Sequence, residues 1–162
     1  MTLPDADPVL FRRLMSHLAS GVTIVTARDP AGRPIGMTAT SFASVSLAPP
    51  LVSICVDQHA DTHRSLRAGG TFVVNLLAAG QEALSRRFAD LPSTDRFIGI
   101  SHRLSRAGVP ILDGILAHLE CEYFAGYELG DHTLFVGRVT GGTAEDGRPL
   151  LYYSGRYFAL AE

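Results

Sequence analysis

The apolar and polar positions near the start of the chain predict a helix followed by a β-hairpin. Leucines recur at four-residue steps after the Asp7-Pro8 pair, which suits an N-cap and a first helical residue, and the pattern stops at Gly21. Residues 22–27 are rich in β-branched side chains and predict a strand. The Asp, Pro, Gly and Arg residues at 29–34 then turn the chain back. We therefore expect one amphipathic helix and one hairpin here.

The middle of the chain predicts one clear strand and one clear helix. Residues 57–63 are polar and predict a loop, and residues 65–67 allow only a short helix before a Gly-Gly pair. The run TFVVNLL at 71–77 predicts a strand, whereas 81–88 predicts a helix with one apolar face. Residues 91–114 scatter Pro, Gly and Ser, so we expect an extended surface segment with little regular structure.

Period-two alternation marks the last third of the chain. Between 117 and 127 the odd positions are mostly apolar, which predicts a strand with one buried face. A Gly-Asp-His turn at 130–132 leads into a β-branched run at 133–140, and a last strand is predicted around 150–153. Strands joined by short turns, with helices at the margins, indicate a mainly β fold built as an antiparallel barrel. No GxGxxG or Walker-type loop is present, so a Rossmann domain is not predicted.

The segment 36–57, GMTATSFASVSLAPPLVSICVD, is the part around which the other elements are expected to be arranged. Two strand-like runs, 37–42 and 51–56, flank a hydroxyl-rich bend, and no Lys, Arg, Asp or Glu lies between Ile35 and Asp57. Neutral hydroxyls and backbone amides suit a phosphate or a polar heterocycle. An ordinary β-rich segment explains the same composition, because Ser and Thr are common in strands and turns. Five hydroxyl residues fall within nine positions of this segment: Thr38, Thr40, Ser41, Ser44 and Ser46.

Composition narrows the class of protein. The chain of 162 residues is 46% hydrophobic and 19% charged, as expected of one folded domain over 1–162. A net charge of −2 and a pI near 6.3 give no footprint for nucleic acid. No apolar run approaches the roughly 18 residues that a membrane span needs, and the early acids argue against a signal peptide. We expect a cytoplasmic protein whose Cys55 and Cys121 lie buried.

Several short segments of the chain form an ordered set. They are Met37–Phe42, Ser44–Leu47 with Pro49–Val52, Phe72–Leu77, Gly130–Leu134 and Pro149–Tyr153. Together they resemble the flavin reductase family, whose members have an FMN-binding Greek-key split β-barrel. The resemblance covers nearly the whole chain from Leu10 to Phe158, so a single split-barrel domain with a core at about 10–158 is expected.

The resemblance implies an NAD(P)H:flavin oxidoreductase that works as a homodimer. Such proteins typically supply reduced FMN or FAD to a two-component flavin monooxygenase, with NADH or NADPH as hydride donor. The flavin ring, ribityl and phosphate contacts fall on four parts of the chain: the hydroxyl-rich stretch, the end of the following strand, the next loop and helix, and the aromatic C-terminal segment. By residue they are Thr38, Ala39, Thr40, Ser41, Phe42, Ser44, Val45, Ser46, Cys55, Val56, Asp57, His63, Arg64, Arg86, Phe88, Tyr152 and Tyr157.

His132 is the candidate catalytic residue. In the resemblance, the His of a Gly-Asp-His turn lies where the nicotinamide meets the flavin, and it acts by stacking or hydrogen bonding. From the residues alone, a turn histidine supporting Asp131 is the alternative. Two departures from the family pattern affect single contacts: Thr40 replaces the usual Asn or Ser, and Ala48 replaces a common Asp.

The expected chemistry needs little acid–base machinery, since hydride transfer is carried by the cofactors. This agrees with the lack of a GxSxG-type nucleophile motif. His59 and His63 lie in a polar loop without a clear ligand cluster, so no metal site is predicted. Arg64 and Arg86 suit a phosphate group or a solvated surface, and Phe42 suits the core or a ring contact.

Two rival functions keep the same fold. A flavin carrier or redox sensor would bind flavin without consuming NAD(P)H. An oxidoreductase with a tightly held flavin would turn over without added flavin and pass electrons to another acceptor. The sequence leaves open FMN or FAD, NADH or NADPH, and the identity of the oxygenase partner.

Overall fold

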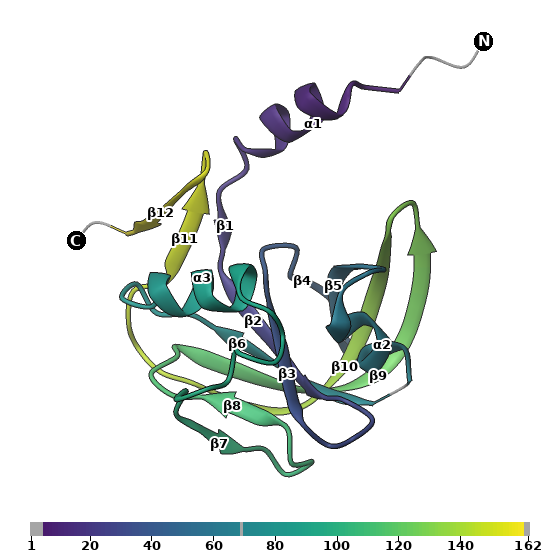
Figure 1. Cartoon of the computed structure of the whole chain (residues 1–162), viewed down its shortest axis with the longest axis vertical. Helices are drawn as coiled ribbons and strands as arrows, with labels where there is room; N and C mark the ends of the chain where they lie inside the picture. Colours follow the sequence, from purple (N-terminus) through teal and green to yellow (C-terminus); the bar gives the residue numbers. More distant parts are fainter. Residues whose placement is uncertain (1–4, 69, 161–162) are drawn as a thin grey trace.

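A seven-stranded antiparallel sheet forms most of the molecule (Figure 1). The computed structural model describes residues 5–68 and 70–160. Along the sheet the strand order is β3-β2-β6-β9-β10-β5-β4. The strands are β2 (Thr23–Arg28), β3 (Pro34–Ala39), β4 (Ala43–Leu47), β5 (Pro50–Asp57), β6 (Thr71–Leu76), β9 (Ala117–Leu129) and β10 (His132–Ala144).

The sheet order explains both the barrel and its opening. Strands β6, β9 and β10 are consecutive neighbours, and β5 lies beside β10, which is a Greek-key order. One core cluster takes side chains from β2, β3, β5, β6, β9 and β10, including Val25, Ile54, Phe72 and Phe135, so the sheet curves around it. The two edge strands are β3 and β4. The predicted antiparallel split barrel is confirmed, and its two edges are joined by residues 40–42.

One element of the predicted bend is corrected by the structure. Residues 44–46 were expected to form a bend, but they belong to edge strand β4, which pairs antiparallel with β5. A register shift between Ser44 and Ser46 marks a bulge. The bulge offsets the alternation of side chains, which explains why a hydroxyl-rich strand reads as a turn in the sequence.

Two helices pack against opposite sides of β3. Helix α2 (Asp61–Arg67) places Leu66 in the barrel core, and α3 (Glu82–Asp90) places Phe88 in a second cluster. The helix at 81–88 is therefore confirmed with small shifts at its ends. Helix α2 begins four residues before the predicted 65–67, because Ala60 starts a turn that continues to His63 by a backbone hydrogen bond.

The segment 91–114 contributes to the core, contrary to the expectation of irregular surface chain. It contains β7 (His102–Leu104) and β8 (Pro110–Leu112), which pair with each other, and all three residues of β8 are buried. The Asn75 side chain fixes β8 in place: its Oδ1 accepts from Leu112 N at 2.9 Å and its Nδ2 donates to Ile24 O at 3.0 Å. Strands of three residues are too short to show a period in the sequence.

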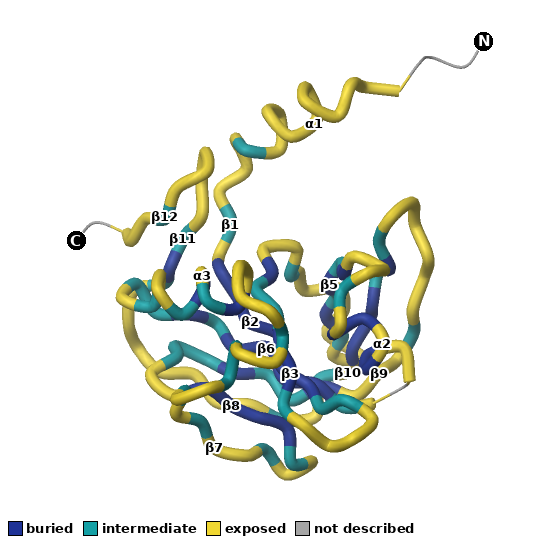
Figure 2. The backbone as a smooth tube through the Cα atoms, in the orientation of Figure 1, coloured by how far each residue is buried: buried dark blue, intermediate teal, exposed yellow. Residues whose placement is uncertain are grey.

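The first helix, α1 (Pro8–Met15), begins as predicted but ends early. Asp7 caps it by accepting from Val9 N, and Pro8 is its first residue. None of its residues is buried, and it projects away from the barrel (Figures 1 and 2). The apolar stripe that predicted an amphipathic helix therefore has no cover within the part of the chain that the structure describes.

A small sheet lies between α1 and the barrel, with the order β1-β11-β12. It is formed by β1 (Ser20–Gly21), β11 (Leu150–Tyr153) and β12 (Arg156–Ala159). The predicted last strand at 150–153 is confirmed as β11. Figure 2 shows that these strands are mostly exposed, like the far ends of β9 and β10.

The distal halves of β9 and β10 form a ribbon that leaves the barrel (Figure 1). Alternation between 117 and 127 predicted a strand with one buried face, and Cys121 is indeed buried. Beyond it the face is open, with Tyr127 57% and Leu129 59% exposed. The pattern thus gave the strand correctly, but half of the apolar face has no partner within the described residues. Among those residues, no helix has the length and apolar character needed to cross a membrane.

Gly137 is a position where the curved sheet leaves no space for a side chain. A Cβ there would lie 2.4 Å from Phe72 Cζ and 3.2 Å from Cys121 Cβ. Gly137→Ala is expected to lower the free energy of unfolding by about 1–3 kcal/mol, the usual cost of overpacking. Gly21→Ala is the control, because nothing lies within 4 Å of its Cβ position. Chemical denaturation of both variants measures the difference, and equal stabilities would refute this packing argument.

Candidate active site

The hydroxyl-rich stretch crosses the opening of the barrel from one sheet edge to the other. On β3, Thr38 Oγ1 donates to Ser85 O at 2.6 Å and so ties the strand to α3. After β3, Ser41 Oγ accepts from Cys55 N at 3.0 Å and donates to Cys55 O at 3.1 Å, which holds this segment on β5. Edge strands present unpaired N–H and C=O groups. The two sheet edges and the exposed hydroxyl residues between them therefore offer neutral donors and acceptors on this side of the barrel.

His132 lies beside the end of β5. Its Cα is paired with that of Asp57 across β5 and β10, and its Nδ1 is 2.7 Å from Asp131 Oδ1. Gln58 secures the turn, since its backbone N–H donates to Asp131 O at 3.1 Å and its Nε2 donates to Gly130 O at 3.3 Å. The predicted residues Cys55, Asp57 and His132 are thus brought to one end of two neighbouring strands.

Two carboxylates give this corner a negative character. The hydrogen bond from the His132 side chain lowers the pKa of Asp131, and the electrostatic attraction between the two side chains lowers it further. The pKa of Asp57 is lowered mainly by the backbone N–H of His59, which donates at 2.7 Å, and further by His132. Both groups are ionised at neutral pH. Asp131 holds the Nδ1 side of the ring, so the other ring nitrogen of His132 is left for another partner.

A second group of predicted residues gathers between α3 and the C-terminal sheet. Ser85 Oγ lies 2.9 Å from Tyr157 Oη, and the Arg86 guanidinium lies 4.9 Å above the Tyr157 ring. Tyr152 meets Tyr157 edge to face at 5.1 Å. Glu82 accepts from Arg86 Nε at 2.8 Å and raises the pKa of Arg86, so the guanidinium stays charged. Since Thr38 also binds Ser85, this group adjoins the first.

The structure separates the predicted contact residues by burial. Val56 and Phe88 are fully buried, Ala39 is nearly so, and His63 is 7% exposed. The side chains of Val56 and Phe88 therefore support the walls, Phe88 by packing edge to face on Phe97, and the predicted place of these two residues beside the flavin stays a prediction. Phe42 packs partly buried against the barrel core. Of the predicted contact residues, those that are exposed are Thr40, Ser41, Ser44, Val45, Ser46, Asp57, Arg64, Arg86 and Tyr152.

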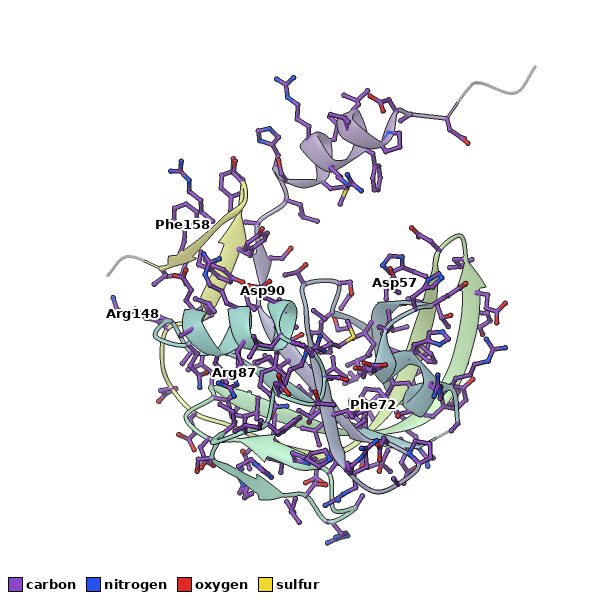
Figure 3. The ribbon with its side chains drawn as sticks, viewed as in Figure 1. Asp57, Phe72, Arg87, Asp90, Arg148 and Phe158 are labelled. Carbon is purple, nitrogen blue, oxygen red and sulfur yellow. The ribbon has the colours of Figure 1, made fainter. Side chains whose placement is uncertain are left out.

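Figure 3 shows how the two flanks of the opening are arranged. Asp57 lies on the β4–β5 side, Asp90 lies at the end of α3 on the β3 side, and Phe72 lies inside the barrel. The helix flank includes Ser85, which joins Thr38 to Tyr157. The resemblance placed the helix at 85–88 near the ribityl-phosphate end, but Ser85 was not named among the contact residues. Its two partners could not be predicted, because they lie on strands 47 and 72 residues away.

The buried His63 is expected to make the stability of the fold depend on pH. Its Nε2 is 2.8 Å from Thr133 Oγ1, its ring packs on Phe135 at 5.3 Å, and burial lowers its pKa from 6.5. The unfolded chain therefore takes up a proton before the folded one, and the free energy of unfolding should fall as pH falls below about 6.5. Buried His118 shifts in the same direction. Melting temperatures between about pH 7.5 and 5 should fall less steeply for His63→Gln; an unchanged slope would contradict a neutral His63.

Comparison with known proteins agrees with this fold. The family model described as "Flavin reductase like domain" matches residues 15–161. The NADH-dependent FAD reductase of Streptomyces globisporus is 44% identical over 156 residues, covering 94% of this chain and 85% of its own length. A probable flavin reductase of Rhizobium meliloti is 41% identical over 158 residues, which are 98% of this chain. The chain spans half of the length of that relative.

Solved structures of flavin reductases have the same fold as this chain. The NADH:FAD oxidoreductase SgcE6 of Streptomyces globisporus C-1027, in complex with NAD and FAD fragments, superposes with a TM-score of 0.90 at 42% identity, covering 98% of both chains. BorF, the flavin reductase component of a bacterial two-component tryptophan halogenase, superposes with a TM-score of 0.84 at 37% identity, covering 96% and 99%. Fold and opening together define the split-barrel class of flavin-handling proteins. The chain belongs to the flavin reductase-like family.

Proposed function

We propose that this protein reduces FMN or FAD with NADH or NADPH and releases the reduced flavin to a monooxygenase partner. The observation that carries the proposal is the run of exposed hydroxyl residues at 40–46 between the sheet edges β3 and β4, with the His132 turn beside β5 and Arg86 on α3. Flavin rings present hydrogen-bonding edges, and a flavin nucleotide adds a phosphate. Neutral hydroxyls, edge amides and one guanidinium match these groups.

A bound flavin supplies the chemistry by accepting a hydride from a reduced nicotinamide. The chain's own residues provide position and polarity. Ser41 fixes the segment that joins the two sheet edges, and Thr38 fixes β3 against α3. His132, whose Nδ1 is held by Asp131, would contact the nicotinamide and position it for hydride transfer. Tyr152 and Tyr157 shield the helix flank from water.

The proposed enzyme is a homodimer. Leu10, Phe11 and Leu14 on α1 are each at least 46% exposed, and Tyr127 and Leu129 on β9 are more than half exposed. Large apolar side chains gathered on projecting elements are typical of interaction surfaces. A second copy of the chain would cover them and complete the environment of the opening.

The proposed partner is a flavin-dependent monooxygenase. Relatives include a protein named as the reductase subunit HsaB of a flavin-dependent monooxygenase in Rhodococcus jostii, 39% identical over 155 residues. The reduced flavin reaches the partner by diffusion, so no docking surface is required. Because its nicotinamide donor is a cytoplasmic metabolite, we place the enzyme in the cytoplasm.

Steady-state oxidation of NADH and NADPH by the purified protein tests the proposal. It is measured without flavin, with FMN and with FAD, and catalytic oxidation should depend on added flavin. Flavin binding without NAD(P)H consumption would replace the proposal by a carrier or sensor. Turnover without added flavin, by a protein purified with its own flavin, would replace it by an oxidoreductase with a tightly held flavin.

A further inference from the structure

A cavity of about 330 Å³ lies on the outer face of the barrel. Its floor is formed by β6, β9 and β10, and its roof by the turn between β7 and β8. Val73 and Glu120 are paired across β6 and β9 and line the cavity, whereas their neighbours Phe72 and Cys121 pack in the barrel core. Because side chains alternate along a strand, the sheet separates this cavity from the barrel interior. None of the lining residues was predicted to contact the flavin.

The turn that roofs the cavity is held in a fixed shape. Ser105 N donates to Val109 O at 2.8 Å, and Val109 N donates to Ser105 Oγ at 3.0 Å. Arg28 on β2 donates from its Nε to Gly108 O. Val109 also packs with Val73 in a buried cluster between the hairpin and the sheet. The cavity is therefore preformed, and its volume lies at the lower end of the range of about 300–1,000 Å³ that is typical of small-molecule sites.

Glu120 places a carboxylate on the floor of this cavity without a charged partner. Its side chain is 26% exposed, and its one ion-pair contact among the described residues is His118 Nε2, which lies 3.8 Å from Glu120 Oε1. Burial lowers the pKa of His118, and nearby Arg103 lowers it further, so the imidazole is neutral at pH 7. The charge of Glu120 is therefore uncompensated. Glu122 differs, because its carboxylate pairs with Arg138 at 2.6 Å.

Arg106 places the opposite charge in the roof. It is exposed, it lines the cavity, and within residues 5–68 and 70–160 its guanidinium takes part in no hydrogen bond or ion pair. The apolar part of the lining comes from Val73, Ala107 and Val109. The cavity thus combines an uncompensated anion from the sheet, an uncompensated cation from the turn and an apolar surface.

We propose that this cavity binds a small zwitterion, namely a free amino acid with an aliphatic side chain. The ammonium group of the ligand pairs with Glu120, and its carboxylate accepts a forked pair of hydrogen bonds from Arg106. The aliphatic side chain lies on the apolar lining. A simple amine or a simple acid would leave one of the two protein charges uncompensated, so the site discriminates against both. This site is independent of the proposed reductase reaction.

Binding of L-valine to the full chain tests the proposal without requiring turnover. Saturation-transfer NMR of the free ligand measures its affinity. L-valine should bind at least tenfold more tightly than isobutylamine or 3-methylbutanoate, because each of these keeps only one of its two charges. Saturating FMN should not displace it, since the cavity lies on the outer face of the sheet. No binding of L-valine, equal binding of the singly charged analogues, or displacement by FMN overturns the proposal.

Two variants on different elements then locate the site. Glu120→Gln and Arg106→Gln should each weaken L-valine binding roughly tenfold or more, since each removes a charge-assisted hydrogen bond. Glu145→Gln is the matched control, because Glu145 is an exposed carboxylate that does not line this cavity. Thermal melting verifies that the three variants are folded. Unchanged binding by either cavity variant, or equal loss in the control, overturns the proposal. Absence of NADH oxidation by the wild-type chain would overturn the proposed function alone.

Discussion

Replacing His132 with alanine is expected to lower the rate of flavin-dependent NAD(P)H oxidation by about 10- to 100-fold, because a misplaced nicotinamide loses near-attack geometry. The imidazole starts β10 directly beside Asp57 and is held by Asp131 at 2.7 Å. Flavin affinity should change little, since the hydroxyl contacts lie on β3 and the segment that follows it. Steady-state kinetics gives the rate, and quenching of flavin fluorescence gives the affinity.

His59→Ala is the matched control for this prediction. His59 is another imidazole on the adjoining loop, with its side chain 92% exposed, and it is not placed in contact with either substrate. It should retain wild-type turnover. Should His132→Ala and His59→Ala behave alike, His132 would be only a turn residue that supports Asp131, and its nicotinamide role would have to be abandoned.

Introducing a charge into the exposed apolar ribbon is expected to break the dimer. In Tyr127→Glu a carboxylate would be buried in each half of the symmetric interface. An unpaired buried charge costs about 3–5 kcal/mol, so the dissociation constant should rise by roughly 100-fold or more. Flavin reduction should fall at the protein concentrations where the variant is monomeric. Sedimentation velocity across a concentration series measures the association state, with activity assayed on the same samples.

Leu104→Glu serves as the control for the interface variant. Leu104 is 54% exposed but belongs to β7, away from α1 and the β9–β10 ribbon. It should sediment as the wild type. A wild-type chain that remains monomeric at every concentration, or an active monomeric Tyr127→Glu, would show that the ribbon does not complete the site.

The hairpins and the barrel class could be predicted because turn residues are local signals. Asp29 accepts from the backbone of its own turn, and Gly130 adopts a positive φ of 64° in the β9–β10 turn. Residues within each turn therefore determine its conformation. Strands such as β6 were equally clear, since a continuous β-branched run suits a fully buried strand. The two hairpins and the resemblance to the flavin reductase family were together sufficient to predict the split barrel.

The parts that could not be predicted depend on distant contacts. Strand β8 is anchored by Asn75, which lies 37 residues earlier, and α2 extends over a stretch that is polar in sequence. The burial of His63, a predicted flavin contact, depends on Thr133, which lies 70 residues away. Local composition marks hydroxyls and imidazoles without revealing which way they face. The sequence predicted the apolar stripe of α1, but it did not predict that this stripe packs against no other described part of the chain.

Anaerobic mixing of the protein and flavin with excess NADH tests the central claim most directly. The account predicts that flavin absorbance bleaches in a fast phase, much faster than in a mixture without protein, and more slowly with His132→Ala. Reduced flavin should then be recovered in the filtrate after ultrafiltration. Bleaching no faster than in the absence of protein, by a chain that demonstrably binds flavin, would contradict a flavin reductase.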